Sequence, residues 1–163
     1  MPIKTLTIPA NLTIIHVGLG PAGQRNFALP GLKPAKSSGK NQLYTVSIDT
    51  HFSASHRLIG YSGPCESLHG HTWKVRVTIQ AEQLDEIGIT VDFKTLNVII
   101  QSVVQKLDHH HINDIPPFDT INPTAENLAG YLYRSIRGKM PDSVSVSEVT
   151  VWESDRYAVS YSE

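Results

Sequence analysis

Seven of the eight histidines of this 163-residue chain lie in two short stretches, residues 51–71 and 109–111. A His-Gly-His motif at 69–71 places two imidazoles at positions i and i+2, which fall on one face of an extended chain. His56, at the end of the preceding strand-like stretch, offers a third ligand. Three neutral imidazoles suit zinc and leave a fourth position open for substrate. Spacing alone is also compatible with surface or core histidines that bind no metal.

Two further groups near these histidines could move protons. Cys65, the single cysteine, lies four residues before His69. A cysteine near a cation loses its proton more readily and becomes a base or nucleophile, although a lone cysteine is usually a small buried hydrophobic residue. Asp108 directly precedes His109, and a carboxylate can fix the tautomer and orientation of an imidazole. Such a pair at the end of a helix is also typical of capping.

Composition and charge exclude several classes of protein. With 40% hydrophobic and 18% charged residues, the chain can bury the core of about one domain. A net charge of −1 gives no basic field for a nucleic-acid partner. No apolar run approaches the roughly 20 residues of a membrane span. One cysteine and no secretory signal indicate a reducing, cytoplasmic compartment.

The first 42 residues differ from the rest and are expected to form an extension of unknown role. They contain no Asp or Glu and are punctuated by Pro and Gly, with one possible strand at 12–17 and a Lys-Ser-Ser-Gly-Lys linker at 36–40. Transit peptides are also poor in acids, but they are richer in Arg and Ser. A G-x-G-x-x-G match at 18–23 lacks the following helix and acid of a dinucleotide site, so it predicts a glycine-rich turn.

The periodicity of residues 43–163 changes twice along the chain. Apolar residues alternate with polar ones at 44–52 and 73–79, which predicts two half-buried strands. A helical face follows at 93–107, with Asp92 placed to cap it. A second helix is indicated after the Asn-Pro-Thr sequence at 122–124 and ends near Gly138.

The chain then returns to strand-like alternation. Valines 144 and 146 lie on one strand face and valines 149 and 151 on the other, which predicts a bulge near 147–148. A last short strand is expected at 157–161. The order of two strands, two helices and two strands predicts an α+β fold, an antiparallel sheet with both helices on one face.

Several motifs, in order, resemble those of the 6-pyruvoyltetrahydropterin synthase family. They are F-x-A-x-H-R-L at 52–58, C-x-x-x-H-G-H at 65–71, V-D-F at 91–93, L-D-H-H at 107–110, Asn-Asp at 113–114, P-T-A-E-N at 123–127 and the late Glu153. The resemblance implies a tunnelling fold (T-fold) domain at 43–163, whose barrel is completed by a homo-oligomer, a hexamer in the family. It also implies active sites between subunits.

The resemblance also implies a role for each matching residue. His56, His69 and His71 would hold Zn²⁺. Cys65, as a thiolate, would be the base, and Asp108 with His109 would relay the proton, from a different chain if the site lies between subunits. Glu153 would anchor the pterin ring of the substrate, with help from Thr124.

The three-residue gap between cysteine and H-G-H resembles 6-carboxytetrahydropterin synthase. That enzyme converts 7,8-dihydroneopterin triphosphate to 6-carboxy-5,6,7,8-tetrahydropterin, acetaldehyde and triphosphate on the route to 7-deazaguanine nucleosides such as queuosine. The pyruvoyl-forming reaction is an alternative. Glu66 resembles the base of relatives that release 6-hydroxymethyldihydropterin for folate.

Two other classes of protein share part of this residue set. A zinc hydrolase would use three histidines and a glutamate but would not require Cys65. A non-catalytic module that binds zinc and pterin would keep the histidines and Glu153 and tolerate loss of the thiol.

Overall fold

The computed structural model describes residues 42–163. The strand expected at 12–17, the glycine-rich turn at 18–23 and the linker at 36–40 lie outside the described residues. The elements are β1 (Tyr44–His56), η1 (Pro64–Glu66), β2 (His69–Ala81), α1 (Phe93–Val104), η2 (Ile112–Asp114), α2 (Ala125–Arg137), β3 (Ser145–Ser154) and β4 (Tyr157–Tyr161). The strands form an antiparallel sheet in the order β1-β2-β3-β4.

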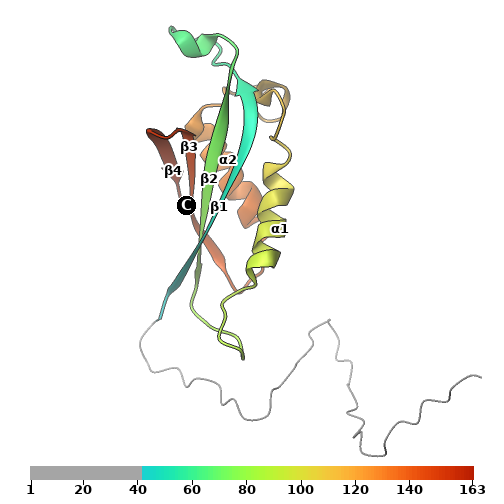
Figure 1. Ribbon diagram of the computed structural model, residues 1–163, viewed down its shortest axis with the longest axis vertical. Coiled ribbons are helices and arrows are strands. Elements are labelled where there is room, and N and C mark those ends of the chain that lie inside the picture. Colours follow the sequence, from blue (N-terminus) through green and yellow to red (C-terminus); the bar gives the residue numbers. More distant parts are fainter. Residues whose placement is uncertain (1–41) are drawn as a thin grey trace, which may run out of the picture. The chain divides into compact units, whose positions relative to one another are not determined.

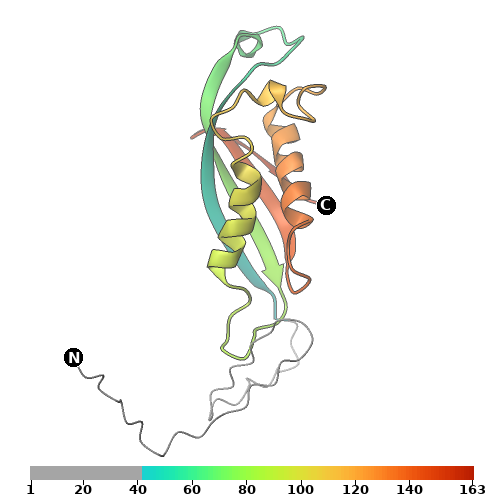
Figure 2. The ribbon, with the colours of Figure 1, turned by 90° about the vertical axis from the view of Figure 1, so that its right-hand side faces the viewer.

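Both helices cover one face of this sheet, as Figures 1 and 2 show from two sides. The expected α+β architecture is confirmed. Among residues 42–163, no helix is long and apolar enough to cross a membrane.

The long β1–β2 hairpin sets the geometry of the molecule. Its ladder runs without interruption from the pair Tyr44↔Ala81 to the pair His56↔His69. Alternation directs one set of side chains, including Phe52 and Trp73, under the helices, where both are fully buried. Both strands are longer than the alternation of apolar residues predicted. His56, His69 and His71 continue the inward-facing pattern of those apolar residues.

The two helices begin where their capping residues predict. The Asp92 carboxylate accepts hydrogen bonds from the N–H groups of Lys94 and Thr95 at the start of α1. The Thr124 hydroxyl accepts one from the N–H of Asn127 at the start of α2. α1 ends at Val104 rather than at Leu107, although Leu107 is still fully buried in the turns that follow.

Strand β3 contains two bulges. Ser147 is the extra residue against β2, between the pairs Thr78↔Glu148 and Ile79↔Val146, which confirms the bulge expected there. The second bulge lies against β4, where Glu153 has no partner between the pairs Trp152↔Ala158 and Ser154↔Tyr157. Bulges re-aim side chains and are over-represented next to active sites. The sequence did not predict this second one.

Two valines on α1 give a matched test of the core. Val103 is 1% exposed and Val98 is 68% exposed. We expect Val103→Ala to lower the free energy of unfolding by about 2 kcal/mol, because it removes buried carbon and leaves a cavity. Val98→Ala should change it by less than about 0.5 kcal/mol. Denaturant unfolding at a fixed protein concentration measures both, and equal effects would contradict the packing described.

Candidate metal centre and active site

Three histidines meet at one end of the sheet because of strand register. His56 ends β1 and pairs directly with His69, the first residue of β2, so their side chains lie on the same face. His71, two residues further along β2, shares that face. The centroid of the His56 ring lies 4.5 Å from that of the His69 ring and 5.2 Å from that of the His71 ring. The structure therefore brings together all three expected metal ligands.

Glu153 joins this group from strand β3. One ligand atom from each of His56, His69, His71 and Glu153 lies within 4.8 Å of all the others. The Glu153 Oε1 atom is 3.5 Å from the Nε2 atom of His56 and 3.4 Å from that of His71. The family resemblance implied only a pterin-anchoring role for Glu153. Its place beside the imidazoles follows the bulge in β3.

Backbone carbonyls fix the second ring nitrogen of two of the histidines, His56 and His69. The Nδ1 atom of His56 lies 2.9 Å from the Pro123 carbonyl oxygen, and that of His69 lies 2.8 Å from the Ser67 carbonyl oxygen. A carbonyl only accepts, so each Nδ1 carries the proton and each Nε2 has a free lone pair. Histidines that bind a metal usually donate their second ring N–H to a carbonyl or carboxylate in this way, which fixes the orientation of the ring.

The donor set fits a metal ion. Among the described residues 42–163, the Nε2 atoms of all three histidines are buried and have no hydrogen-bond partner. Burial is the largest influence on the pKa of His56 and of His71, and it lowers both despite the opposing Pro123 carbonyl and Glu153 carboxylate. Neutral imidazoles near neutral pH are the form that binds zinc.

Asp108 and His109 form the expected pair beside the edge of β1 that does not pair with β2. The Asp108 carboxylate accepts a hydrogen bond from the Ser53 N–H at 2.8 Å, which is the main cause of its lowered pKa. Its second oxygen lies 2.9 Å from the His109 Nδ1 atom. His109 is held at a φ of 59° while its N–H donates to the Ser53 carbonyl. The contact with Asp108 thus involves the Nδ1 atom of His109 and leaves Nε2 as the ring nitrogen on the other side.

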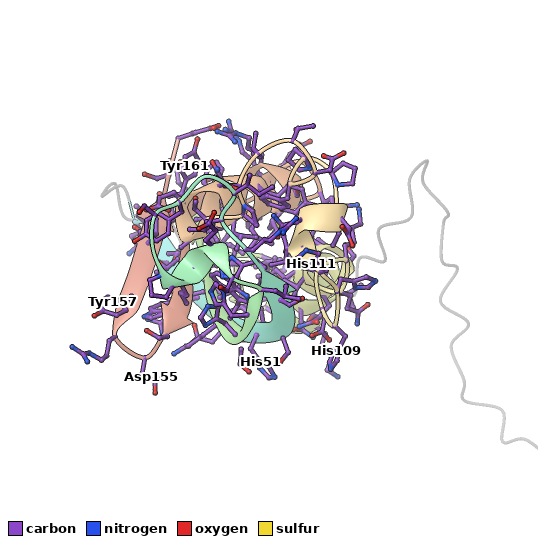
Figure 3. All side chains as sticks on the ribbon, turned by 90° about the horizontal axis from the view of Figure 1, so that it is seen from above. His51, His109, His111, Asp155, Tyr157 and Tyr161 are labelled. Carbon is purple, nitrogen blue, oxygen red and sulfur yellow. The ribbon has the colours of Figure 1, made fainter. Side chains whose placement is uncertain are left out.

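The His109 side chain is 81% exposed and points away from the subunit (Figure 3). His109, His110 and His111 line an open cavity of about 510 Å³ together with the metal-cluster residue His71. Residues 109–111 pair with the outer edge of β1 at Ser55. One cavity thus adjoins both a member of the histidine cluster, His71, and His109 of the expected proton-transfer pair.

Figure 1 shows the loop that joins β1 to β2. Cys65 is the middle residue of η1, which belongs to this loop. Its side chain is partly buried, and that of the neighbouring Glu66 is exposed. Within residues 42–163, the thiol has no hydrogen bond to the Asp108–His109 pair and does not line the cavity of about 510 Å³. The structure does not bring the three expected catalytic residues together within one subunit.

Two asparagines that the sequence analysis did not identify as functional hold the start of this loop. Asn113 accepts from the N–H of Arg57 and donates to its carbonyl, both at 3.0 Å. Asn122 does the same for Ile59, at 2.8 and 2.9 Å. Between them, the N–H of Leu58 donates to the Cys65 carbonyl at 2.8 Å. These amide clamps fix Cys65 relative to His56.

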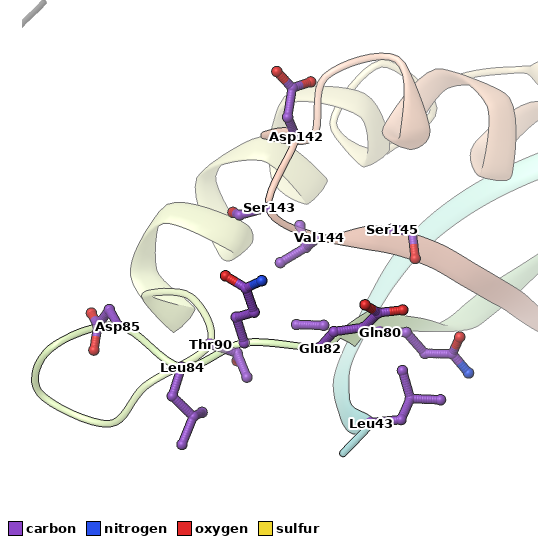
Figure 4. A pocket seen from close by; sticks show the side chains of 12 residues that line it. Leu43, Gln80, Glu82, Leu84, Asp85, Thr90, Asp142, Ser143, Val144 and Ser145 are labelled. Atoms are coloured by element: carbon purple, nitrogen blue, oxygen red, sulfur yellow. The ribbon is translucent and has the colours of Figure 1, made fainter. Parts of the chain in front are cut away.

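Thr124 acts here as the cap of α2, and the adjacent Pro123 carbonyl supports His56. A second cavity, of about 630 Å³, lies at the opposite end of the sheet (Figure 4). Its lining includes Leu43, Glu82 and Asp142 but no histidine or cysteine. None of the residues expected to bind metal or transfer a proton lines this second cavity.

Comparison with known proteins agrees with this geometry. A Pyrococcus furiosus protein named dihydroneopterin monophosphate aldolase is 34% identical over 94 residues, which are 58% of this chain and 77% of the relative. A Rickettsia bellii protein named 6-carboxy-5,6,7,8-tetrahydropterin synthase is 32% identical over 109 residues, covering 56% and 79% of the two chains.

The fold is also similar to that of a solved structure. The 6-pyruvoyl tetrahydropterin synthase of Caenorhabditis elegans superposes with a TM-score of 0.68 at 25% identity, over 75% of this chain and 96% of the other. The sequence model of the family described as 6-pyruvoyl tetrahydropterin synthase matches residues 45–163. With its three-histidine site in the matched region, the chain belongs to the 6-pyruvoyl tetrahydropterin synthase family.

Proposed function

We propose that this chain is a zinc-dependent lyase that converts 7,8-dihydroneopterin triphosphate to 6-carboxy-5,6,7,8-tetrahydropterin, acetaldehyde and triphosphate. Its place would be in 7-deazaguanine (queuosine) biosynthesis. Membership of the family and the names of its relatives support a pterin-synthase type of lyase. The choice of substrate and product depends on the loop between His56 and His69, which carries Cys65.

The observation that carries the proposal is the position of Cys65. The loop that holds it begins at one metal ligand, His56, and ends at the paired ligand, His69. Only three residues separate the thiol from the H-G-H motif. The hydrogen bond from the Leu58 N–H to the Cys65 carbonyl ties this residue to the chain two positions after His56.

In this proposal, each residue has one task. His56, His69 and His71 hold zinc, which when bound supplies Lewis-acid polarisation of the substrate's side-chain hydroxyls. The Cys65 thiolate takes a proton from the adjacent side-chain carbon. His109, oriented by the contact of its Nδ1 atom with Asp108, moves a proton onward through its Nε2 atom.

The rest of the site would bind the substrate. The Glu153 carboxylate accepts hydrogen bonds from adjacent N–H donors of the pterin ring, and Thr124 supports the loop beside it. Because His109 points out of its own subunit, the Asp108–His109 pair would serve a site completed by another copy. A homo-oligomer, a hexamer by family resemblance, and a cytoplasmic location belong to the same proposal.

Glu66 supports a second candidate function. It adjoins Cys65, its side chain is exposed, and it could act as an alternative base. A relative with 34% identity is named as an aldolase of dihydroneopterin monophosphate. In this second candidate, the chain cleaves the same side chain and releases a 6-hydroxymethyldihydropterin. A pyruvoyl-forming reaction is the third possible product branch.

A product assay separates these branches. We expect the zinc-loaded protein, given 7,8-dihydroneopterin triphosphate, to release 6-carboxytetrahydropterin together with acetaldehyde and triphosphate. Mass spectrometry identifies the pterin, and a coupled dehydrogenase measures acetaldehyde. A 6-hydroxymethyl or 6-pyruvoyl product would contradict the proposed branch, and absence of any turnover would favour a binding module.

Removal of the thiol tests catalysis separately from metal binding. We expect Cys65→Ala to lower turnover at least about 100-fold, since it removes the base, while zinc stoichiometry is unchanged. Ser62→Ala, an exposed position in the same loop, is the matched control and should retain activity. A fully active Cys65→Ala variant would point to a hydrolase-like use of the metal instead.

The glutamate beside the cysteine has its own test. We expect Glu66→Gln to keep the carboxy product, because the exposed carboxylate is not the base in this proposal. The same product assay, run with the dihydroneopterin triphosphate substrate, gives the answer. Loss of all turnover in Glu66→Gln would assign the base to Glu66 and move the protein to the folate branch.

A further inference from the structure

The Glu153 carboxylate is placed unusually for a group whose only task is to hold a pterin. Its Oε1 atom is 3.5 Å from the Nε2 atom of His56 and 3.4 Å from that of His71. Both separations are longer than the roughly 2.7–3.2 Å of an N–H···O hydrogen bond. Within residues 42–163, both nitrogens are buried and have no hydrogen-bond partner. The contact of the His56 Nδ1–H with the Pro123 carbonyl leaves a lone pair on the His56 Nε2 atom. A lone pair that faces a carboxylate oxygen is repelled by it, and a metal cation between the two would relieve that repulsion.

The separations fit the edges of a zinc coordination tetrahedron. Imidazole and carboxylate ligands lie about 2.0–2.2 Å from zinc, so two ligands of a tetrahedral ion are about 3.3–3.6 Å apart. The two measured N···O distances fall in this interval. We propose that Glu153 is the fourth ligand of the metal in the absence of substrate, which closes a site of three histidines and one carboxylate.

The backbone is built to hold the carboxylate there. Glu153 is the bulged residue of β3, without a partner on β4. The preceding residue, Trp152, is fixed on the outer face of the sheet by its pairing with Lys74 and by the cations of Lys74 and Arg76 over its ring. With Trp152 held outward, the Glu153 side chain is directed to the opposite face, where the imidazoles lie.

A closed coordination sphere has a consequence for the reaction. Closed four-ligand sites are typical of structural zinc, whereas catalytic zinc keeps one position for substrate. The substrate would therefore have to displace the Glu153 carboxylate before the metal could polarise the hydroxyls of the substrate. The displaced carboxylate is then free to accept from the pterin ring, an exchange that rests on the proposed function above.

Metal affinity tests the resting-state ligand without any turnover. The metal-free full chain is titrated with zinc in competition with a chromogenic chelator. We expect Glu153→Gln to bind zinc at least about ten-fold more weakly than the wild type, because it removes a charged ligand. Asp155→Asn is the matched control: it loses the same charge two residues away at an exposed position, and should bind like the wild type.

Cobalt absorption distinguishes a ligand from a nearby charge. Substituted Co²⁺ should give a different visible spectrum in Glu153→Gln than in the wild type. Glu153→Asp keeps the charge but withdraws the carboxylate by one carbon, so it too should change the spectrum and weaken zinc binding. Unchanged zinc affinity and an unchanged cobalt spectrum in Glu153→Gln would overturn the proposal.

The exchange is tested with pterin lacking a side chain, which has no hydroxyls to offer the metal. Its binding, followed by quenching of pterin fluorescence, should shift the wild-type cobalt spectrum towards that of Glu153→Gln and leave the variant's spectrum unmoved. Binding without a spectral shift would overturn the exchange. Failure of pterin to bind would count against the proposed function, whereas zinc affinity still decides the resting-state ligand.

Discussion

The register between β1 and β2 is the constraint on which the rest of the site depends. Because His56 pairs with His69, both imidazoles share one face of the sheet, and His71 follows on the same face. A slip of one residue would move every inward side chain of β1 to the outer face. The apolar residues of the same strands prevent that slip, since Phe52 and Trp73 are fully buried under the helices. Core packing thus fixes the metal ligands.

The other parts of the site are attached to this hairpin from outside. The Pro123 carbonyl reaches His56 from the start of α2, and the Ser53 backbone holds the Asp108–His109 pair. Asn113 and Asn122 provide, with side chains, the hydrogen bonds that a neighbouring strand would otherwise give to residues 57 and 59. Each connection joins residues more than fifty positions apart, so the complete fold is needed to assemble the site.

The sequence predicted those features that depend on local patterns. Alternation and helical periodicity identified the elements, Asp92 and Thr124 marked the helix starts, and a change of parity indicated the bulge near Ser147. The bulge at Glu153 was not predictable, because the β3–β4 pairing that creates it involves only a few residues at a turn. The amide clamps were also missed, since an asparagine in a loop carries no local sign of a partner 56 or 63 residues away.

The way the Cys65 loop is anchored bears on how such a protein can diverge. The loop leaves and re-enters the sheet at two residues that face each other, and its first three residues are tied in place. Lengthening a surface loop costs little free energy, and loops tolerate insertions better than the elements they connect. Residues 60–68 can therefore gain or lose length, or exchange their acidic and thiol groups, while the histidines keep their positions. New reaction outcomes can evolve in this scaffold at an unchanged metal site.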